Sequence, residues 1–333
     1  MKKLLSVNNL QVHFTTFAGE VQAVRGVSFD LAAGEAIAVV GESGCGKSVT
    51  AQSIMKLIPS PPGRYMAGEI FFNGENLLPK TEKEMETIRG KDIGMIFQDP
   101  MTSLNPTMKV GHQIVEMLKK HTNLTGEAVK RRAVEMLALV GLPNPEKRYD
   151  QYPHQFSGGM RQRAMIAMAL ACNPRLLIAD EPTTALDVTI QAQILELMQE
   201  LKDKLGTSII LITHDLGVVA GFASRVIVMY AGKVVESGTT GEIFYRHRHP
   251  YTRGLLASVP RPGKEIRKKL NPIAGRPPGL INPPRGCAFW PRCDRAMQVC
   301  REVQPDMVQL SDTHWVSCWL THEFAAKGAN VRS

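Results

Sequence analysis

The stretch Gly41-Glu42-Ser43-Gly44-Cys45-Gly46-Lys47-Ser48 decides the fold class, because it is a glycine-rich turn between an apolar run and a helical pattern. Residues 36–40, Ala-Ile-Ala-Val-Val, precede it, and the helical pattern begins near Val49. Glycine lets backbone amides face inward, and the helix N-terminus adds positive potential where phosphates bind. The spacing Gly-x4-Gly-Lys-Ser in this setting predicts a P-loop. Lys47 would reach the terminal phosphates, and the Ser48 hydroxyl would coordinate Mg²⁺.

Short apolar runs, bounded by glycine or polar residues, alternate with amphipathic helical patterns along residues 1–240. Such runs suit strands that are buried on both faces of a parallel sheet. We therefore expect an α/β fold with a P-loop NTPase (RecA-like) core and a β-rich N-terminal subdomain. The predicted strands are residues 36–40, 176–179, 208–212 and 226–229, and residues 69–74 resemble a strand that enters a turn.

The alternation is interrupted by a helical block over about residues 99–175. Within it, residues 110–120 and 125–140 show apolar spacing of three and four, and Gly141 ends the second helix. We expect this block to be a helical subdomain inserted into a nucleotide-binding domain of residues 1–248. Residues 249–333 would form a small irregular module, because the prolines between 260 and 291 disfavour helices and central strands.

Two carboxylates, Asp180 and Glu181, end the apolar run at 176–179, where α/β folds bind their ligands. Asp180 suits Mg²⁺ through water, because that ion retains part of its hydration shell. Glu181 could polarise or deprotonate an attacking water. Ser157-Gly158-Gly159, at the start of an Ala/Met-rich helix, offers a hydroxyl and free backbone amides to a second anion. Two phosphate-binding loops in one domain suggest a site that another subunit completes.

Composition narrows the class of protein. The chain has 333 residues and a net charge of +9, from 40 Lys and Arg against 31 Asp and Glu. Its apolar runs fall short of the roughly 18–20 residues of a membrane span, and its start lacks a secretory signal. We expect a cytoplasmic protein with peripheral membrane contact.

Residues 246–276 are strongly basic. Such a segment is typical of a solvated linker, or of a segment that is attracted to anionic lipid or nucleic acid. Because no aromatic residues are interleaved to stack on bases, nucleic-acid binding is not expected.

These motifs together resemble the ATP-binding subunit of an ABC transporter over nearly the whole chain. Residues 156–160, Phe-Ser-Gly-Gly-Met, match that family's signature loop, although the family usually has Gln where Met160 stands. The resemblance implies that Gln98 links Mg²⁺ and water to the helical subdomain and that His214 touches the γ-phosphate. It also implies that Asp187, in Ala185-Leu186-Asp187, belongs to the D-loop.

The resemblance further implies which residues contact ATP. Phe14 would stack on adenine, with Phe17 as a rival for this role. Catalysis would depend on Glu181, His214, Gln98 and Lys47. This chain's own ATP would contact Phe14, Gly41, Ser43, Gly44, Cys45, Gly46, Lys47, Ser48, Val49, Gln98, Asp180 and His214. The ATP of the partner would contact Ser157, Gly158, Gly159 and Asp187, and Mg²⁺ would be held by Ser48, Gln98 and Asp180.

Residues 248–256, Arg-His-Pro-Tyr-Thr-Arg-Gly-Leu-Leu, resemble the start of the C-terminal extension of dipeptide and oligopeptide importer ATPases. Residues 98–106 and 180–187 also resemble that subfamily. The resemblance implies a second ATPase subunit in a heterodimer, two membrane permease subunits and, indirectly, a peptide-binding protein, at the cytoplasmic face of the membrane. A nickel importer of the same subfamily and a non-transport ABC ATPase are the alternatives.

Four cysteines lie in the proline-rich C-terminal region, spaced C-x5-C-x6-C-x17-C: Cys287, Cys293, Cys300 and Cys318. A reducing cytoplasm disfavours disulfides. A small irregular module therefore needs another cross-link to stabilise its fold, and a bound metal can provide it. Zinc sites usually contain a short C-x2–4-C pair, which is absent here. Four thiolates suit an iron–sulfur cluster, and the subfamily resemblance implies a [4Fe–4S] centre. Zinc and four unrelated buried thiols remain the alternatives.

Overall fold

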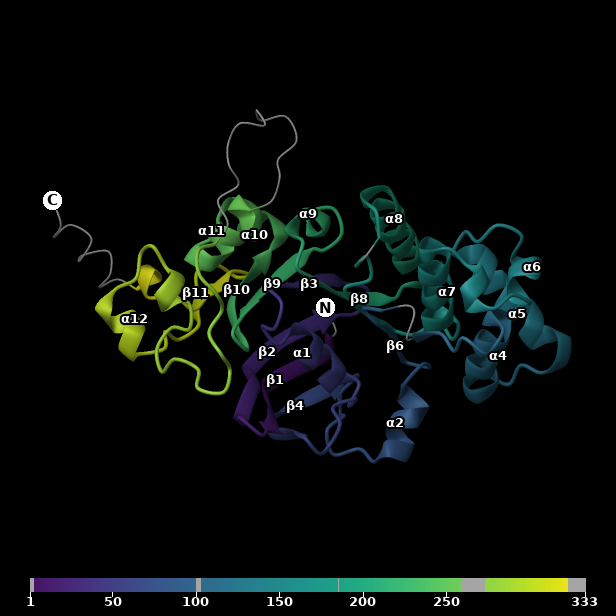
Figure 1. The fold of residues 1–333 in the computed structure, drawn as a ribbon, viewed down its shortest axis with the longest axis horizontal. Helices are drawn as coiled ribbons and strands as arrows, with labels where there is room; N and C mark the ends of the chain where they lie inside the picture. The colour runs from purple at the N-terminus through teal and green to yellow at the C-terminus, as the bar shows by residue number, and fades with distance from the viewer. Residues whose placement is uncertain (1–2, 100–102, 185, 259–272, 323–333) are drawn as a thin grey trace. The chain divides into compact units, whose positions relative to one another are not determined.

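The computed structural model describes residues 3–99, 103–184, 186–258 and 273–322 (Figure 1). Its chain divides into two compact units, which are described separately. The first contains residues 1–4, 31–36 and 76–212, and the second contains residues 5–30, 37–75 and 213–333. Ala185, the residues 100–102 and the basic residues between 261 and 269 lie outside the described ranges, so the predictions made for them stay predictions, as does the boundary at residue 248.

The first unit contains three parallel strands in the order β8-β7-β6. β7 pairs in register with both neighbours, so that Leu176 faces Ser208 on one side and Ile93 on the other. All residues of these strands are buried, which confirms the predicted strands at 176–179 and 208–212. The unit consists of α2 (Glu82–Ile88), β6 (Ile93–Ile96), α4 (Val110–His121), α5 (Gly126–Leu139), α6 (Pro145–Tyr149), η1 (Pro153–Gln155), α7 (Gly158–Leu170), β7 (Leu176–Asp180), α8 (Val188–Leu205) and β8 (Ser208–Thr213).

Helices α4, α5, α6 and α7 pack against one another (Figure 1). Close packing depends on Gly111, because a Cβ at this position would lie 2.1 Å from the ring of Tyr149. The predicted helices at 110–120 and 125–140 are confirmed as α4 and α5. Gly141 follows α5 with a φ of 71°, a left-handed conformation that favours glycine and ends the helix.

The second unit contains two sets of strands. One is ordered β2-β1-β4-β5, with β1 and β4 antiparallel; the other is ordered β11-β12-β10-β9-β3, with β3 and β9 parallel. The predicted strands at 36–40 and 226–229 are confirmed. The unit consists of β1 (Lys3–Thr16), β2 (Gly19–Ala32), β3 (Ala36–Val40), α1 (Lys47–Ile54), β4 (Gly63–Phe72), β5 (Glu75–Asn76), α9 (Leu216–Val219), β9 (Arg225–Tyr230), β10 (Lys233–Thr239), α10 (Thr240–Tyr245), α11 (Pro250–Ala257), η2 (Trp290–Arg292), α12 (Gln298–Glu302), β11 (Val308–Gln309), β12 (Trp315–Val316) and η3 (Trp319–Thr321).

In addition to residues 249–258, which include α11, the described part of the C-terminal module consists of residues 273–322. The helices and strands of residues 273–322 are five residues long or shorter, as the proline density predicted. β12 nevertheless extends the sheet by pairing with β10, so that Val316 faces Glu236. The module is therefore attached to the second unit by backbone hydrogen bonds as well as by side chains.

None of the helices within the described ranges is both long and apolar enough to cross a bilayer.

Candidate nucleotide-binding site

The P-loop connects the buried strand β3 to helix α1 in the second unit. Two glycines allow its close approach to neighbouring backbone. A Cβ at Gly41 would lie 2.2 Å from the carbonyl oxygen of Met229, and one at Gly46 would lie 2.4 Å from that of Ala23. Gly46 also has a φ of 99°, which L side chains rarely adopt. The loop can therefore hold this shape only with glycine at these positions.

Lys47 begins helix α1 and is buried, with 4% of its surface exposed. Its ammonium nitrogen Nζ donates to the carbonyl oxygens of Gly41 at 2.8 Å and Glu42 at 3.1 Å. Both acceptors belong to the start of the P-loop, so the side chain of Lys47 links the end of the loop to its start. An ammonium has three donors, and the third can serve a phosphate oxygen. Ser43 and Gly44 are exposed on the same loop, whereas Cys45 is a buried residue that fills the space beneath it.

The C-terminal module holds the P-loop through Glu42. The carboxylate of Glu42 accepts from both terminal nitrogens of Arg292, at 2.6 and 2.8 Å, in a bidentate ion pair. Arg292 is buried, and its remaining N–H groups donate to the hydroxyl of Tyr230 and the carbonyl oxygens of Ile273 and Ala274. All five guanidinium donors are therefore used, which fixes the orientation of the side chain.

A second link joins helix α11 to the same loop residue. The backbone N–H of Glu42 donates to the hydroxyl oxygen of Tyr251 at 2.8 Å. Burial raises the pKa of Tyr251, so its hydroxyl stays protonated. The ring of Tyr251 packs against Tyr230, with centroids 4.5 Å apart, and against Phe289, at 5.4 Å. An aromatic cluster thus supports the P-loop from beneath, in addition to the ion pair.

In the first unit, the structure brings together two predicted catalytic residues. The side-chain amide of Gln98 donates to Oε2 of Glu181 at 3.1 Å, and the hydroxyl of Thr184 donates to the same oxygen at 3.0 Å. Glu181 follows β7 with a φ of 47°, an uncommon backbone conformation for a residue other than glycine. Asp180, the last residue of β7, is buried. Glu181 is therefore held in one orientation at the carboxyl end of the strand.

Three of the four residues predicted to contact the ATP of a partner are exposed. Ser157 caps helix α7, with its hydroxyl accepting from the N–H of Met160 at 3.3 Å, and Gly158 begins that helix. Asp187 caps helix α8 by accepting from the N–H of Ile190 at 2.9 Å. Ser157, Gly158 and Asp187 are all exposed, whereas Gly159 is half-buried. These caps leave backbone amides at the helix starts facing outward.

The other predicted residues lie in the second unit. His214 is exposed and directly follows β8. Phe14 is half-buried in β1, and its ring lies near Gly63, where a Cβ would approach it to 3.1 Å. Phe17, its rival for the adenine contact, is fully exposed in a turn. Ser48 and Val49 are half-buried in the first turn of α1.

The four C-terminal cysteines line one small cavity, of about 10 Å³, together with His249 and the aromatic residues Phe289, Trp290 and Trp319. None of them forms a disulfide. Burial and the neighbouring thiols raise the pKa of Cys287 to about 11 and that of Cys318 to about 12, so both are thiols at neutral pH. No group of three or more His, Cys, Asp or Glu side chains in the described part of the chain is arranged to hold a metal ion.

The donor set nevertheless suits a metal in its chemistry. Four thiols converge on one cavity, Cys300 from α12 and the other three from loop positions, in a module whose helices and strands are too short to bury a core of their own. A metal or cluster would displace their protons on binding. The cavity has room for about one water molecule, so the cysteines would have to move apart to admit a cluster.

Comparison with known proteins defines the class. Residues 24–184 match the family model described as ABC transporter, and residues 235–300 match the model described as oligopeptide/dipeptide transporter, C-terminal region. The dimeric ATP-binding cassette MJ0796, solved in a post-hydrolysis state with ADP and phosphate, is 28% identical, with a TM-score of 0.64 over 71% of this chain and 98% of that one. The cbiO1 protein of Clostridium perfringens has a TM-score of 0.63 at 27% identity, over 73% of this chain and 91% of that one. The fold and site are those of an ABC transporter ATPase.

Two curated relatives indicate to which group within the family the chain belongs. The oligopeptide transport ATP-binding protein OppD of Bacillus subtilis is 63% identical over 98% of this chain and 91% of its own length. The dipeptide transport ATP-binding protein DppD of the same organism is 58% identical, over 98% of this chain and 97% of its own length. The chain therefore belongs to the ABC transporter family, in the group that carries the oligopeptide/dipeptide transporter C-terminal region.

Sequence reasoning missed several residues that support the site. Nothing in the spacing of the sequence connects Glu42 with Arg292, which stands 250 positions away. Tyr251 stands within residues 248–256, whose pattern assigns it no contact with the P-loop. Thr184 follows Glu181 by three residues, and its hydroxyl could have been suspected as a partner, because turn residues at this spacing often bond one another.

Proposed function

We propose that this chain binds and hydrolyses ATP to power the import of dipeptides or oligopeptides through membrane permease subunits. The observation that carries the proposal is the match of residues 235–300 to the C-terminal region of oligopeptide/dipeptide transporters, in a chain 63% identical to an oligopeptide transport ATP-binding protein. The same match favours peptide over nickel as the transported solute. The peptide itself would be bound by other subunits, at the outer face and in the membrane.

The proposed mechanism uses two ATPase subunits that meet head to tail. Each ATP would lie between the P-loop of one subunit and the Ser157-Gly158-Gly159 loop of the other. The exposure of that loop supports this role, because its amides are available to a partner. Two different ATPase chains, two permeases and a peptide-binding protein would make up the transporter, with this subunit at the cytoplasmic face of the membrane.

Hydrolysis is the attack of a water on the γ-phosphorus of ATP, with cleavage of its bond to the ADP oxygen. We assign Glu181 to orient and polarise that water. The bonds from Gln98 and Thr184 support this assignment because they fix the carboxylate oxygen that would accept the proton. Ser48, Gln98 and Asp180 are the proposed residues for Mg²⁺, which would neutralise phosphate charge. Lys47 and His214 would stabilise the charge that develops on the γ-phosphate.

The decisive variant is Glu181→Gln, which keeps the size of the side chain and its bond to Thr184 but removes its basicity. Loss of a general base lowers turnover by about 100-fold or more, while Mg-ATP binding should persist and a closed ATP-bound dimer should accumulate with the partner present. Hydrolysis rate and solution mass would be measured together. Glu196→Gln, on the exposed face of α8, is the matched control. Near wild-type hydrolysis by Glu181→Gln would refute the assignment.

We further propose that Cys287, Cys293, Cys300 and Cys318 hold a [4Fe–4S] cluster that stabilises the C-terminal module. Their convergence on one cavity supports this, and four thiolates are the usual ligands of such a cluster. Its role would be structural, since ATP-driven transport requires no electron transfer.

Anaerobically purified protein should be brown and contain about four irons per chain. Cys293→Ser should lose both, while Cys172→Ser, a half-buried thiol of the first unit, should keep them. ATP binding should persist in either variant. Colourless anaerobic protein with one zinc per chain would instead establish a zinc–tetrathiolate site.

A further inference from the structure

A cavity of about 590 Å³ lies beside helices α10 and α11 in the second unit, separate from the P-loop. Its walls come from two chain segments, one over residues 242–253 and the other over residues 295–321. Seven of the thirteen lining residues are arginine or histidine, and one is a carboxylate. The arginines and histidines are Arg246, His247, Arg248, His249, Arg253, Arg295 and His314.

Most of this positive charge is not neutralised within the fold. Arg253 forms an ion pair with Asp294 at 2.6 Å. The guanidinium groups of Arg246, Arg248 and Arg295, in contrast, make no ion pair with any residue in the described ranges. Three like charges around one hollow repel one another, and an anion bound there would relieve this repulsion.

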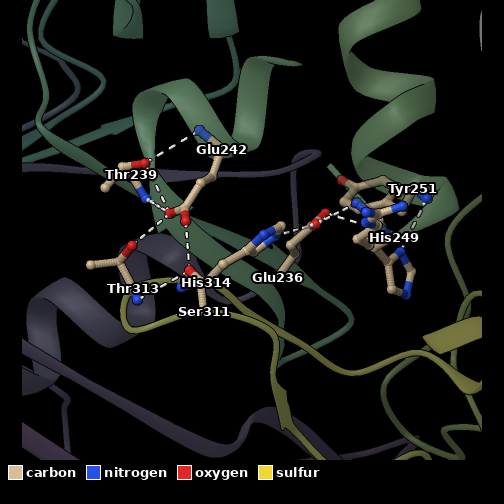
Figure 2. A network of polar contacts seen from close by, with 9 residues as sticks. Glu236, Thr239, Glu242, His249, Tyr251, Ser311, Thr313 and His314 are labelled. Atoms are coloured by element: carbon tan, nitrogen blue, oxygen red, sulfur yellow. Dashed lines mark hydrogen bonds and ion pairs between the residues drawn. The ribbon is translucent and has the colours of Figure 1, made fainter. Parts of the chain in front are cut away.

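The one carboxylate in the wall, Glu242, is already satisfied by other donors. It accepts from the N–H and hydroxyl of Thr239 and from the hydroxyls of Ser311 and Thr313, at 2.6 to 2.9 Å (Figure 2). These bonds fasten the loop around residue 311 to helix α10. Glu242 therefore stabilises the wall of the cavity. Because its oxygens already accept four hydrogen bonds, it contributes little to neutralising the charge of the arginines.

A second buried carboxylate, Glu236, lies behind the lining residues and links the same two chain segments. Glu236 accepts from the backbone N–H groups of Arg248 and His249, at 2.6 and 3.1 Å, and pairs with Nε2 of His314 at 2.9 Å (Figure 2). The backbone that carries Arg248 is thus held in place before any ligand arrives. Preorganised walls lower the entropic cost of binding.

His247 contributes a buried polar atom that lacks a hydrogen-bond partner among the described residues. Nδ1 of His247 is buried and has no hydrogen-bond partner among the described residues, although His247 lines the cavity. Nε2 of His249 is likewise unpartnered, but His249 also lines the cysteine cavity. Only His247 is therefore assigned to this site. A buried polar atom without a partner is costly, and in the tautomer that carries the proton on Nδ1 a phosphate oxygen that reached it would accept its hydrogen bond.

We propose that this cavity binds a small anion that carries more than one phosphate group. Guanidinium forks match phosphate oxygens in bidentate geometry, and three of them exceed what a single carboxylate would need. The volume lies within the roughly 300–1,000 Å³ of small-molecule sites. Leu310 and Leu320 offer apolar surface to the remainder of the ligand. The inference is independent of the proposed transport function.

The test uses the full-length chain with Lys47→Ala, which suppresses phosphate binding at the P-loop. Inorganic tripolyphosphate is titrated into this background by calorimetry, and the double variant Arg248→Ala/Arg295→Ala is compared with it. Each lost charge-assisted contact weakens binding by about tenfold or more, so the double variant should lose at least about 100-fold. Both arginines are exposed, so the fold should survive. Arg285→Ala, an exposed arginine of the same module outside the cavity, is the matched control.

Vesicles distinguish the source of the phosphate. If tripolyphosphate binds and the double variant loses it, the ligand is a soluble phosphate compound. If only vesicles that contain cardiolipin, a lipid with two phosphates, bind, and the same variant abolishes this binding while phosphatidylcholine vesicles never bind, the phosphates are those of a lipid headgroup. Equal loss in Arg285→Ala would show that only general charge is involved and would overturn the site. Absence of binding to both probes would overturn it as well.

Discussion

The P-loop and the Ser157-Gly158-Gly159 loop both precede helix starts and are both proposed to bind phosphate, yet their surroundings in the fold differ. The P-loop is enclosed: Lys47 bonds its carbonyls, Gly46 lies against Ala23, and Arg292 and Tyr251 hold Glu42. The other loop is exposed, and its local support is the cap made by Ser157. This difference agrees with the proposal that the P-loop binds this chain's own ATP and that the exposed loop serves the ATP of a partner subunit.

The contrast indicates where the C-terminal module contributes. Through Arg292 it supplies a buried countercharge to the second residue of the P-loop. The exposed loop belongs to the first unit, to which that module does not belong. Loss of the Arg292 anchor should therefore weaken nucleotide binding by the isolated chain, and damage to the exposed loop should affect only the assembled ATPase.

The largest effect should come from paired glycine substitutions. Gly46→Ala would place a methyl group 2.4 Å from a carbonyl oxygen at a φ of 99°, so nucleotide binding should fall below detection. In Gly158→Ala the nearest atom lies 3.8 Å away, so the isolated chain should fold and bind ATP normally. Hydrolysis with the partner subunit should nevertheless fall at least about tenfold, because the methyl would occupy space needed by the partner's nucleotide. Calorimetry and a hydrolysis assay with the partner would measure both. Reduced ATP binding by isolated Gly158→Ala would contradict the division of roles.

A smaller effect is expected when the anchor of the P-loop is removed. Arg292→Ala leaves the Glu42 carboxylate without its countercharge, which costs about 3–5 kcal/mol in a fully buried pair. Because the side chain of Glu42 is 26% exposed, we expect about 2 kcal/mol, or roughly a 30-fold weaker affinity for Mg-ATP. Arg253→Ala breaks an exposed pair of the same module with Asp294 and should cost less than about 1 kcal/mol. Equal affinities for the two variants would show that the anchor does not shape the loop.

The smallest effect is an acid response of the C-terminal module. Burial alone would raise the pKa of Glu242, but hydrogen bonds from Ser311, Thr239 and Thr313 outweigh it and lower the pKa to about 2, from an ordinary 4.5. A carboxyl with a lowered folded-state pKa stabilises the fold above its unfolded pKa, and this contribution is lost as pH falls from about 4.5 towards 2. Between pH 5 and pH 3 this loss should stay below about 2 kcal/mol.

Urea unfolding of the full chain, followed by the fluorescence of the module's three tryptophans, would measure this response between pH 5 and pH 3. Glu242→Gln should be less stable at pH 5 and should show a flatter pH dependence. Glu302→Gln, an exposed carboxyl of the same module, should leave the pH dependence unchanged. If Glu242→Gln keeps the full slope, another carboxyl governs the acid response.

Local sequence determined the elements that carry the chemistry. Five apolar residues before Gly41 form β3, and the run before Asp180 forms β7, because each is short, apolar and bounded by residues that end strands. The P-loop and the caps at Ser157 and Asp187 likewise depend on residues within a few positions of one another. Their conformations follow from backbone freedom and nearby donors, which a reader of the sequence can see.

The tertiary structure alone decided which distant residues support those elements. Arg292 reaches Glu42 across 250 positions, Gln98 reaches Glu181 across 83, and the four cysteines share a cavity with His249. The basic stretch at 246–248 was visible in the sequence as charge, but only the fold shows that it faces Arg295 across a cavity. Such pairings depend on which surfaces become buried together. The packing of the whole chain decides which surfaces are buried together, and the spacing of residues along the sequence does not reveal it.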